Sequence, residues 1–287
     1  QAPGGTNDIV GRVVAQRLGE QIKASVVVEN KPGAGSTIGT DFVAKSAPDG
    51  YTLVMVSTAH VLGPWVYKKV PYNALKDFTV VCRLVDSAYV FVVNPKVPAK
   101  NVKEFIALAK ASPDSLRYAS SGNGGNQHLM GSLFATMTDT KLQHVPYKGS
   151  GQAIVDLLGG QITMNFDTLP PNLQQIRQGN LKALAISTPK RLPLLPNVPT
   201  FNEVGIVGFD VTNWYSVMGP KGMDPAVVNK IDLAVKAATN DPEIKKTLDA
   251  QGLQPEGPVT PAAFNLFLAG ELAKYQRLVK SLNIKAE

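Results

Sequence analysis

The chain has 287 residues, of which 44% are hydrophobic and 18% charged, so it is long enough to bury two cores instead of one. Its formal net charge is +7, but the lysines are scattered and are not interleaved with aromatic residues as in a nucleic-acid platform. No apolar run approaches the roughly 18 residues that a membrane helix needs. We therefore expect an ordinary globular protein without a nucleic-acid partner.

Hydrophobic patterning predicts an α/β protein. Short β-rich runs alternate with amphipathic helical runs, which favours layers of helices on largely parallel sheets. After Asp224 the pattern turns almost wholly helical, and Asp224, Asp241 and Thr260 are each placed to cap a helix that begins with proline. The expected strands cover residues 25–30, 51–57, 78–85, 89–94, 116–120, 143–147, 162–167 and 181–187.

Two segments are expected to cross between lobes. Residues 92–105 break a strand with two prolines, and residues 201–220 lead out of the second α/β region. We expect short crossings near Val92–Pro95 and Gly208–Thr212, with a ligand in the cleft between the lobes. One lobe would then contain residues 1–91 and 211–287, and the other residues 92–210.

Three strand-to-helix turns share one chemistry, at residues 2–8, 120–128 and 147–153. Each supplies glycines, which let the backbone approach a ligand closely, and small hydroxyl or amide side chains just before a helix. The first N–H groups of a helix have no partner within it, and the helix dipole favours negative charge there. Glycine and serine also build ordinary turns, but three such loops in one chain favour an anion receptor.

Other motifs give little support for a cofactor, a metal site or catalysis. The glycines at 33, 35 and 39 follow an expected strand but are spaced G-x-G-x-x-x-G, which departs from the dinucleotide fingerprint. His60, His128 and His144 lack zinc-site spacing, and Cys82 lies in an apolar strand and has no partner cysteine. For His128, a hydrogen bond to the ligand or to its own loop is favoured over a role as a base.

Five stretches together resemble the tripartite tricarboxylate transporter solute receptors, the TctC or Bug family of periplasmic binding proteins. The combination of "ENKPGAG" with "PDGYTL" is more specific than any single glycine loop. The resemblance runs along essentially the whole chain. It implies a two-lobed, hinge-closing receptor that binds carboxylates through backbone amides and ordered waters. The stretches are residues 2–18, 26–53, 118–134, 144–167 and 181–205.

The resemblance also implies which residues bind the ligand. The first and second glycine loops, the "STAH" strand end, Tyr147 and the Asp167-Thr168 pair fall where the family shapes its pocket. Two departures, at Gly125-Asn126 and at residues 60–64, touch expected pocket walls, so the carboxylate itself is not specified. The expected ligand-binding residues are Pro3, Gly4, Gly5, Thr6, Asn7, Asp8, Ser57, Thr58, His60, Ser120, Ser121, Gly122, Asn123, His128, Tyr147, Asp167 and Thr168.

The expected function is that of a periplasmic, monomeric receptor without a cofactor or metal, which delivers a small organic acid to membrane transporter subunits. Two alternatives stay open. One is an enzyme that acts on a carboxylate with His128 as base, and the other is a sensor that reports ligand binding to a signalling partner. In the family a signal peptide and a strand precede the first loop, so we also expect a β-strand directly upstream of Gln1.

Overall fold

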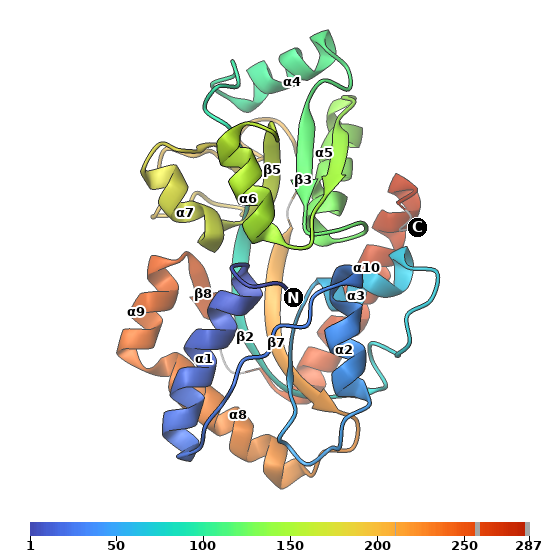
Figure 1. The fold of residues 1–287 in the computed structure, drawn as a ribbon, viewed down its shortest axis with the longest axis vertical. Coiled ribbons are helices and arrows are strands. Elements are labelled where there is room, and N and C mark those ends of the chain that lie inside the picture. Colours follow the sequence, from blue (N-terminus) through green and yellow to red (C-terminus); the bar gives the residue numbers. More distant parts are fainter. Residues whose placement is uncertain (210, 256–258, 285–287) are drawn as a thin grey trace.

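The computed structural model describes residues 1–209, 211–255 and 259–284. Figure 1 shows two lobes, one above the other, with two long strands passing between them. The strands are β1 (Val54–Ser57), β2 (Phe78–Val93), β3 (Arg117–Ser120), β4 (Gln143–Pro146), β5 (Met164–Thr168), β6 (Lys182–Ile186), β7 (Thr212–Pro220) and β8 (Leu253–Pro255).

Helices cover the sheets of both lobes (Figure 1). In the lower lobe of the figure lie α1 (Thr6–Ile22), α2 (Thr37–Ala44), α3 (Ala59–Val66), α8 (Pro225–Asn240) and α9 (Pro242–Ala250). The upper lobe carries α4 (Val102–Ala111), α5 (Asn126–Thr138), α6 (Ser150–Gly159) and α7 (Leu169–Arg177). The last helix, α10 (Pro261–Leu282), packs on both α3 and α5, so it touches both lobes.

The sheets are mixed, so the expectation of largely parallel sheets is wrong for most strand pairs. β2 is antiparallel to β5, β6, β7 and β8, and β1 is antiparallel to β7. Parallel pairing links β3 to β4 and to β5. The reason is the long β2, which carries the chain out of the lower lobe. β7 returns beside it in the opposite direction.

β2 belongs to both lobes. Its residues 78–88 pair with β7, and its residues 89–93 pair with β5. The sequence predicted two strands here, at residues 78–85 and 89–94, but Asp86 and Ser87 between them continue the ladder, opposite Trp214 and Asn213. The partner sheet thus changes between Ala88 and Tyr89. The division at residues 91 and 211 stays a prediction, and Asp210 lies outside the described residues.

Residues 25–30 do not form the expected strand. Val26 and Val28 lie against Gly19 and Gly11 of α1, whereas Val27 is 82% exposed. A strand requires a neighbour to complete its hydrogen-bond ladder, and no described strand pairs with this segment. The alternating valines therefore cover α1 without entering a sheet.

The caps predicted for the C-terminal helices are confirmed. Asp224 accepts a hydrogen bond from the amide of Ala226, and Asp241 accepts from the amide of Glu243. Thr260 caps α10 in the same way. None of the described helices is long and apolar enough to cross a membrane.

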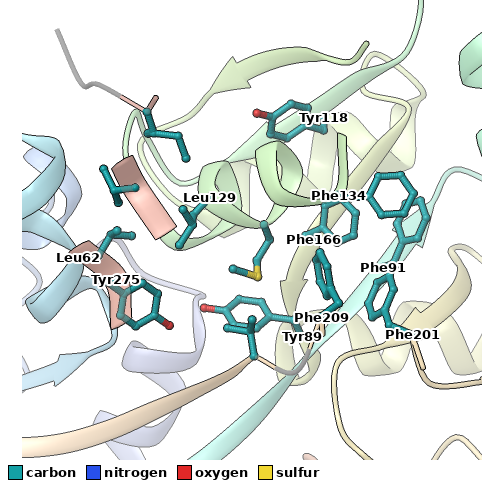
Figure 2. Close-up of a cluster of buried hydrophobic side chains, with 14 of the residues drawn as sticks. Leu62, Tyr89, Phe91, Tyr118, Leu129, Phe134, Phe166, Phe201, Phe209 and Tyr275 are labelled. Carbon is teal, nitrogen blue, oxygen red and sulfur yellow. The ribbon is translucent and has the colours of Figure 1, made fainter. Parts of the chain in front are cut away.

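The largest core joins the two lobes beside the shared strands. Figure 2 shows its aromatic side chains, with Phe91 of β2 among Phe134, Phe166 and Phe201. The ring centroids of Phe91 and Phe166 lie 4.6 Å apart. Leu62, Leu129 and Tyr275 extend this cluster toward α3, α5 and α10. The end of β2 is therefore held firmly in the upper lobe.

Candidate functional site

A cavity lies between the lobes where β2 and β7 pass. It holds about 60 Å³, counted as the space open to the centres of water molecules. Strand residues Tyr89, Asn213 and Tyr215 line it from the shared strands. The other lining residues are Gln1, Ala2, Gly5, Thr6, Asn7, Gly33, Gly35, Ser36, Ala59, Ser121, Gly125, Asn126, Gln127, Lys148, Gly149, Ser150, Asp167 and Thr168.

Six helices begin at this cavity, and none has a side-chain cap. Their N-cap residues are glycine in α1, α5 and α6, serine in α2 and threonine in α3 and α7, with no side-chain hydrogen bond to the following amides. In α7, Pro170 and Pro171 remove two of the possible donors. First-turn residues of α1, α3, α5 and α6 line the cavity, whereas α2 and α7 contribute only their N-cap residues. The positive ends of the helix dipoles gathered there suit a bound anion.

One hydrogen-bond network runs from Ser121 to Asp167. The backbone N–H of Ser121 donates to Gln127 Oε1 (3.0 Å), so the other end of the amide must be the donor. Gln127 Nε2 donates to Asp167 Oδ1 and to Ser150 Oγ, both at 2.8 Å. The amide of Thr168 also donates to Asp167 Oδ1 (2.8 Å). Every one of these contacts with the carboxylate therefore falls on Oδ1.

A second network joins the two lobes through Thr58. Its backbone N–H donates to Asn213 Oδ1 (3.3 Å), and its hydroxyl donates to the same oxygen. Asn126 Nδ2, from α5, donates to Thr58 Oγ1 (2.5 Å). Asn213 Nδ2 donates to the hydroxyl of Tyr215 (2.5 Å). The fixed N–H of Thr58 thus sets the orientation of both asparagine amides.

Two further hydrogen bonds bridge the lobes. The hydroxyls of Thr6 and Thr168 lie 2.7 Å apart, and the hydroxyl of Tyr67 donates to the carbonyl of Asn123 (2.6 Å). Gly35 makes the second contact possible, because a Cβ at that position would lie 2.6 Å from Tyr67 Oη. These contacts join the start of α1 to the start of α7, and the end of α3 to the loop before α5, in a closed arrangement.

Burial shifts the pKa of three side chains that line the cavity, Asp167, Tyr89 and Tyr215. Burial raises the pKa of Asp167, whereas its hydrogen bonds act in the opposite direction. These come from Gln127, Thr168, Ser150 and Asn172. Burial likewise raises the pKa of Tyr89 and Tyr215, and the nearby Asp167 carboxylate adds to this effect. Both phenols are therefore neutral hydroxyl groups at physiological pH.

The structure brings some of the predicted site residues to the cavity and not others. Gly5, Thr6, Asn7, Ser121, Asp167 and Thr168 line it. Gly4 and Asp8 lie next to it, with the amide of Gly4 bound to Asp8 Oδ2 (3.1 Å). The predicted residues outside the lining are Pro3, Gly4, Asp8, Ser57, Thr58, His60, Ser120, Gly122, Asn123, His128 and Tyr147.

His60 points into the core of the lower lobe and away from the cavity. It is 2% exposed, its Nε2 donates to the carbonyl of Ala74 (2.8 Å), and its ring stacks on Tyr72. Burial lowers the pKa of His60 to about 4. The family resemblance placed it at the pocket as the last residue of "STAH", but as the second residue of α3 it faces inward.

His128 braces its loop. Its Nδ1 accepts a hydrogen bond from the amide of Gly124 (3.0 Å), and its ring stacks on His144 with centroids 3.8 Å apart. His144 Nε2 lies 2.6 Å from Ser120 Oγ. Burial lowers the pKa of both imidazoles, that of His144 to about 3. The pair supports the backbone that carries Ser121 and Gly125 into the cavity.

Other predicted residues have structural partners outside the cavity. The hydroxyl of Tyr147 donates to Asp156 on α6 (2.6 Å). Asp8 forms an ion pair with Arg12 (2.9 Å) and accepts from Asn30 Nδ2 (2.9 Å), which lowers its pKa despite the opposing effect of burial. These contacts fix the loop before α1 without placing the carboxylate of Asp8 at the cavity.

Sequence reasoning missed several lining residues. Asn126 and Gln127 belong to the second glycine loop. Their position in the first turn of the predicted helix could have identified them as cavity residues. Tyr89, Asn213 and Tyr215 carry no local signal, because only the pairing of β2 with β7 brings them together. The loop at residues 33–36, discounted as a nucleotide site, lines the cavity as well.

The described residues contain no group of three or more His, Cys, Asp or Glu side chains arranged to hold a metal ion. Cys82 is buried in β2 and 2% exposed. Burial raises the pKa of its thiol to about 12. A thiol protonated to this degree is a poor nucleophile.

Comparisons with known proteins agree with this architecture. The chain is 37% identical over 285 residues to Protein BugT of Bordetella pertussis, covering 99% of this chain and 87% of BugT. Its fold matches R. palustris Rpa4515 with adipate, at 30% identity and a TM-score of 0.95, covering 99% of this chain and 95% of that one. It also matches MatC (Rpa3494) from Rhodopseudomonas palustris with bound malate, at 28% identity and a TM-score of 0.92, covering 97% and 96%. Residues 10–284 match the family described as "Tripartite tricarboxylate transporter family receptor", and the chain therefore belongs to this family of solute-binding receptors.

Proposed function

We propose that this protein is a periplasmic receptor that captures a small organic carboxylate and presents it to the membrane subunits of a tripartite transporter. The observation that carries the proposal is the gathering of six uncapped helix starts at one cavity between two lobes. Backbone N–H groups bind an anion without bringing a fixed counter-charge into the site. The protein can therefore hold a carboxylate tightly and release it again.

In this proposal, closure of the lobes tells the transporter that the receptor has bound its ligand. The contacts Thr6–Thr168 and Tyr67–Asn123, and the Thr58–Asn126 bond, each join a residue of the lower lobe to one of the upper lobe. A bound acid that touches helix starts in both lobes would favour this arrangement over an open one. The transporter would then recognise the closed surface and leave the empty, open receptor unbound.

The ligands of the two R. palustris proteins support a small acid. Adipate and malate are both dicarboxylates, and a cavity of about 60 Å³ between helix starts is suited to a compact anion. Lys148 lines the cavity but is exposed at the surface, so it does not provide a buried counter-ion. The proposed binding energy comes mainly from backbone amides.

The proposal is tested by calorimetric titration of the purified protein with a panel of mono-, di- and tricarboxylates. We expect at least one acid to bind stoichiometrically, and mass spectrometry of the recovered ligand to find it chemically unchanged. Turnover of any acid would favour the enzyme alternative instead. If no carboxylate binds and none co-purifies with the natively prepared protein, the receptor proposal is wrong.

A further inference from the structure

The segment that precedes α1 lies against the start of α6 in the other lobe. Figure 1 shows the N-terminal end of the chain between the two lobes. A Cβ added at Gly4 would lie 4.0 Å from the Cα of Gly151, and one added at Gly5 would lie 4.0 Å from Ser150 Oγ. The two segments therefore lie so close that a single added methyl group would bridge them.

Residues 2–5 are fixed to the lower lobe because their backbone is hydrogen-bonded to the first turn of α1. The amide of Gly4 donates to Asp8 Oδ2 (3.1 Å), and the amide of Asp8 donates to the carbonyl of Gly5 (3.0 Å). Asn30 Nδ2 donates to the other oxygen of the same carboxylate (2.9 Å). The segment must therefore move with α1, and it separates from α6 whenever the lobes open.

Among the glycines of this contact, Gly149, the residue before α6, has the least space. A Cβ added there would lie 2.6 Å from the Cβ of Ala2 and 3.8 Å from its Cα. Non-bonded carbon atoms prefer separations of about 3.5–4.0 Å, so the first of these distances is too short. Outside the neighbouring residues of its own segment, no other described atom lies within 4 Å of this position. A methyl group at residue 149 would therefore collide with Ala2 of the lower lobe.

The local backbone does not require a glycine at this position. Gly149 has extended torsion angles (φ 171°, ψ 167°), which other residues also adopt. Gly4 and Gly122 differ, because their φ angles of +83° and +131° lie in the left-handed region that favours glycine. Gly149 is also the N-cap of α6, a position where serine or aspartate would stabilise the helix more. The proximity of Ala2 is therefore the structural reason for a glycine at residue 149.

We infer that Gly149 is a positioning residue for lobe closure, because its missing side chain lets residues 2–5 rest on α6 and retain a bound acid. This inference rests on the proposed function and adds the residue that controls how long the acid stays bound. A ligand held between two lobes can leave only after they separate. Affinity differences between related complexes lie mostly in the dissociation rate, and a looser closed arrangement should raise this rate.

An alternative role for Gly149 is to leave room for the ligand, since both Gly149 and Ala2 line the cavity. Both roles predict that Gly149→Ala weakens binding. They differ in the atom that the new methyl group meets, which is the Cβ of Ala2 in one case and an atom of the acid in the other. A variant that removes only the Cβ of Ala2 therefore separates them.

The first measurement compares Gly149→Ala with the wild type, by surface plasmon resonance on the immobilised full chain. The probes are malate and adipate or, if neither binds, the tightest-binding acid of the carboxylate panel. We expect the dissociation rate to rise at least about 10-fold and the association rate to change by less than about 3-fold. Small-angle X-ray scattering at saturating acid should give a larger radius of gyration for the variant than for the wild type. Urea unfolding without acid shows whether the variant is folded.

The decisive measurement is rescue by Ala2→Gly, which removes the methyl group that a Cβ at residue 149 would meet. The nearest atom is then the Cα of residue 2, at 3.8 Å, which is an ordinary contact. The effect of Gly149→Ala is measured with Ala2 present and with Ala2→Gly in place. We expect it to fall from at least about 10-fold to less than about 3-fold. An alanine that displaced the acid, or that only weakened the N-cap of α6, would have the same effect in both backgrounds.

Two further variants complete the test. Ala2→Leu enlarges the lower-lobe side of the contact without changing α6, and it should raise the dissociation rate as Gly149→Ala does. Gly151→Ala is the matched comparison, because its methyl group would lie 3.4 Å from the carbonyl oxygen of Pro3, at ordinary contact distance. We expect Gly151→Ala to raise the dissociation rate by less than about 3-fold.

The possible outcomes separate the inference from the proposed function. Unchanged dissociation rates in folded Gly149→Ala and Ala2→Leu variants would overturn the inference, and so would a loss that Ala2→Gly leaves undiminished. An effect of Gly151→Ala as large as that of Gly149→Ala would overturn it as well. In these cases the wild type still binds the acid, so the proposed function stands. If no acid of the panel binds to the wild type, both fail.

Discussion

The ten α-helices of the described chain fall into two groups at their N-termini. The four that begin away from the cavity, α4, α8, α9 and α10, all have a side-chain cap, from Asn101, Asp224, Asp241 and Thr260. The six that begin at the cavity have none. Capping contributes about 1 kcal/mol to the stability of a helix.

This difference shows that the open N-termini are a local property of the site. The same chain caps a helix wherever the helix start serves stability alone, and glycine replaces the capping residue at α1, α5 and α6. The unsatisfied N–H groups of the cavity helices are then available to a ligand. If the proposed function is correct, the helix starts that bind the ligand and the helix starts that are capped for stability lie in different parts of the protein.

The largest effect on acid binding is expected when an uncapped helix N-terminus at the cavity is converted into a capped one. Gly5 has extended backbone angles (φ −84°, ψ 169°), and a Cβ added there would meet nothing closer than Ser150 Oγ at 4.0 Å. Gly5→Asp therefore fits, caps α1 and places a carboxylate in the cavity. We expect acid binding to weaken by at least about 100-fold, because like charges a few ångströms apart repel by several kcal/mol.

Calorimetric titration measures the loss of acid affinity in Gly5→Asp, and urea unfolding shows whether the variant is folded. Gly5→Asn is the control for size and capping without charge, and it should retain more of the binding than Gly5→Asp. Wild-type affinity in Gly5→Asp would mean that the start of α1 does not contact the acid.

A decrease in pH should destabilise the cavity helices more than the helices that begin elsewhere. The cavity helices α3 and α5 carry histidines in their first turns, and burial lowers the pKa of His60 to about 4 and also lowers that of His128. Below pH 6.5 the unfolded chain takes up protons that the folded chain excludes, so stability is complete above pH 6.5 and falls as the pH decreases. His60 alone should contribute a loss of about 1.5 kcal/mol between pH 6.5 and 5.

Urea unfolding at pH 7 and pH 5 measures this loss. His60→Gln keeps an N–H donor for the carbonyl of Ala74 but cannot be protonated. On acidification the variant should therefore lose about 1.5 kcal/mol less of its free energy of unfolding than the wild type loses. Identical pH profiles for the wild type and the variant would show that His60 is accessible to protons in the folded state.

Removing a cap away from the cavity should affect stability and leave binding unchanged. Asn101 accepts from the amide of Glu104 (2.9 Å) at the start of α4. We expect Asn101→Ala to lower the free energy of unfolding by about 1 kcal/mol and to change the dissociation constant of the acid by less than about 2-fold. A larger change in binding would contradict the separation of the two groups of helices.

The smallest effect is expected for the charged side chain at the cavity. Lys148 lines the cavity but is exposed, and exposed ion pairs contribute less than about 1 kcal/mol. Lys148→Ala should therefore weaken acid binding by less than about 5-fold in calorimetric titration. Complete loss of binding would instead identify a charge clamp and reduce the role assigned to the backbone amides.

The part of the fold that depends on local signals was predictable. The caps at Asp224, Asp241 and Thr260 act within one turn of the chain, so sequence alone placed them correctly. The end of β2 and the run at residues 25–30 depend on which strands lie beside them, and here the predictions differed from the structure. The crossing expected near Gly208–Thr212, where a glycine break meets strand character, stays a prediction.

The site shows the same division. The glycine loops at Gly5 and Ser121 were predicted from composition next to a helix, and they line the cavity. His60 was misplaced, because the direction in which a side chain faces on a short helix depends on the core beneath it. Asn213 and Tyr215 were missed, because their position follows from the register of β7 against β2.

The exchange of partners along β2 has a mechanical consequence. Ser187 stabilises the place where β2 changes its partner strand. Its Oγ accepts a hydrogen bond from the amide of Tyr89 (2.9 Å) and donates one to the carbonyl of Val211 (2.5 Å). A strand that is continuous through both lobes cannot slide, so opening must occur by changes in the backbone torsions of the few residues near Ala88 and Val211. Two hydrogen-bonded strands bend readily across their ladder and resist bending within it. We therefore expect β2 and β7 to act as a hinge with one direction of bending, so that the lobes open by rotation about a single axis.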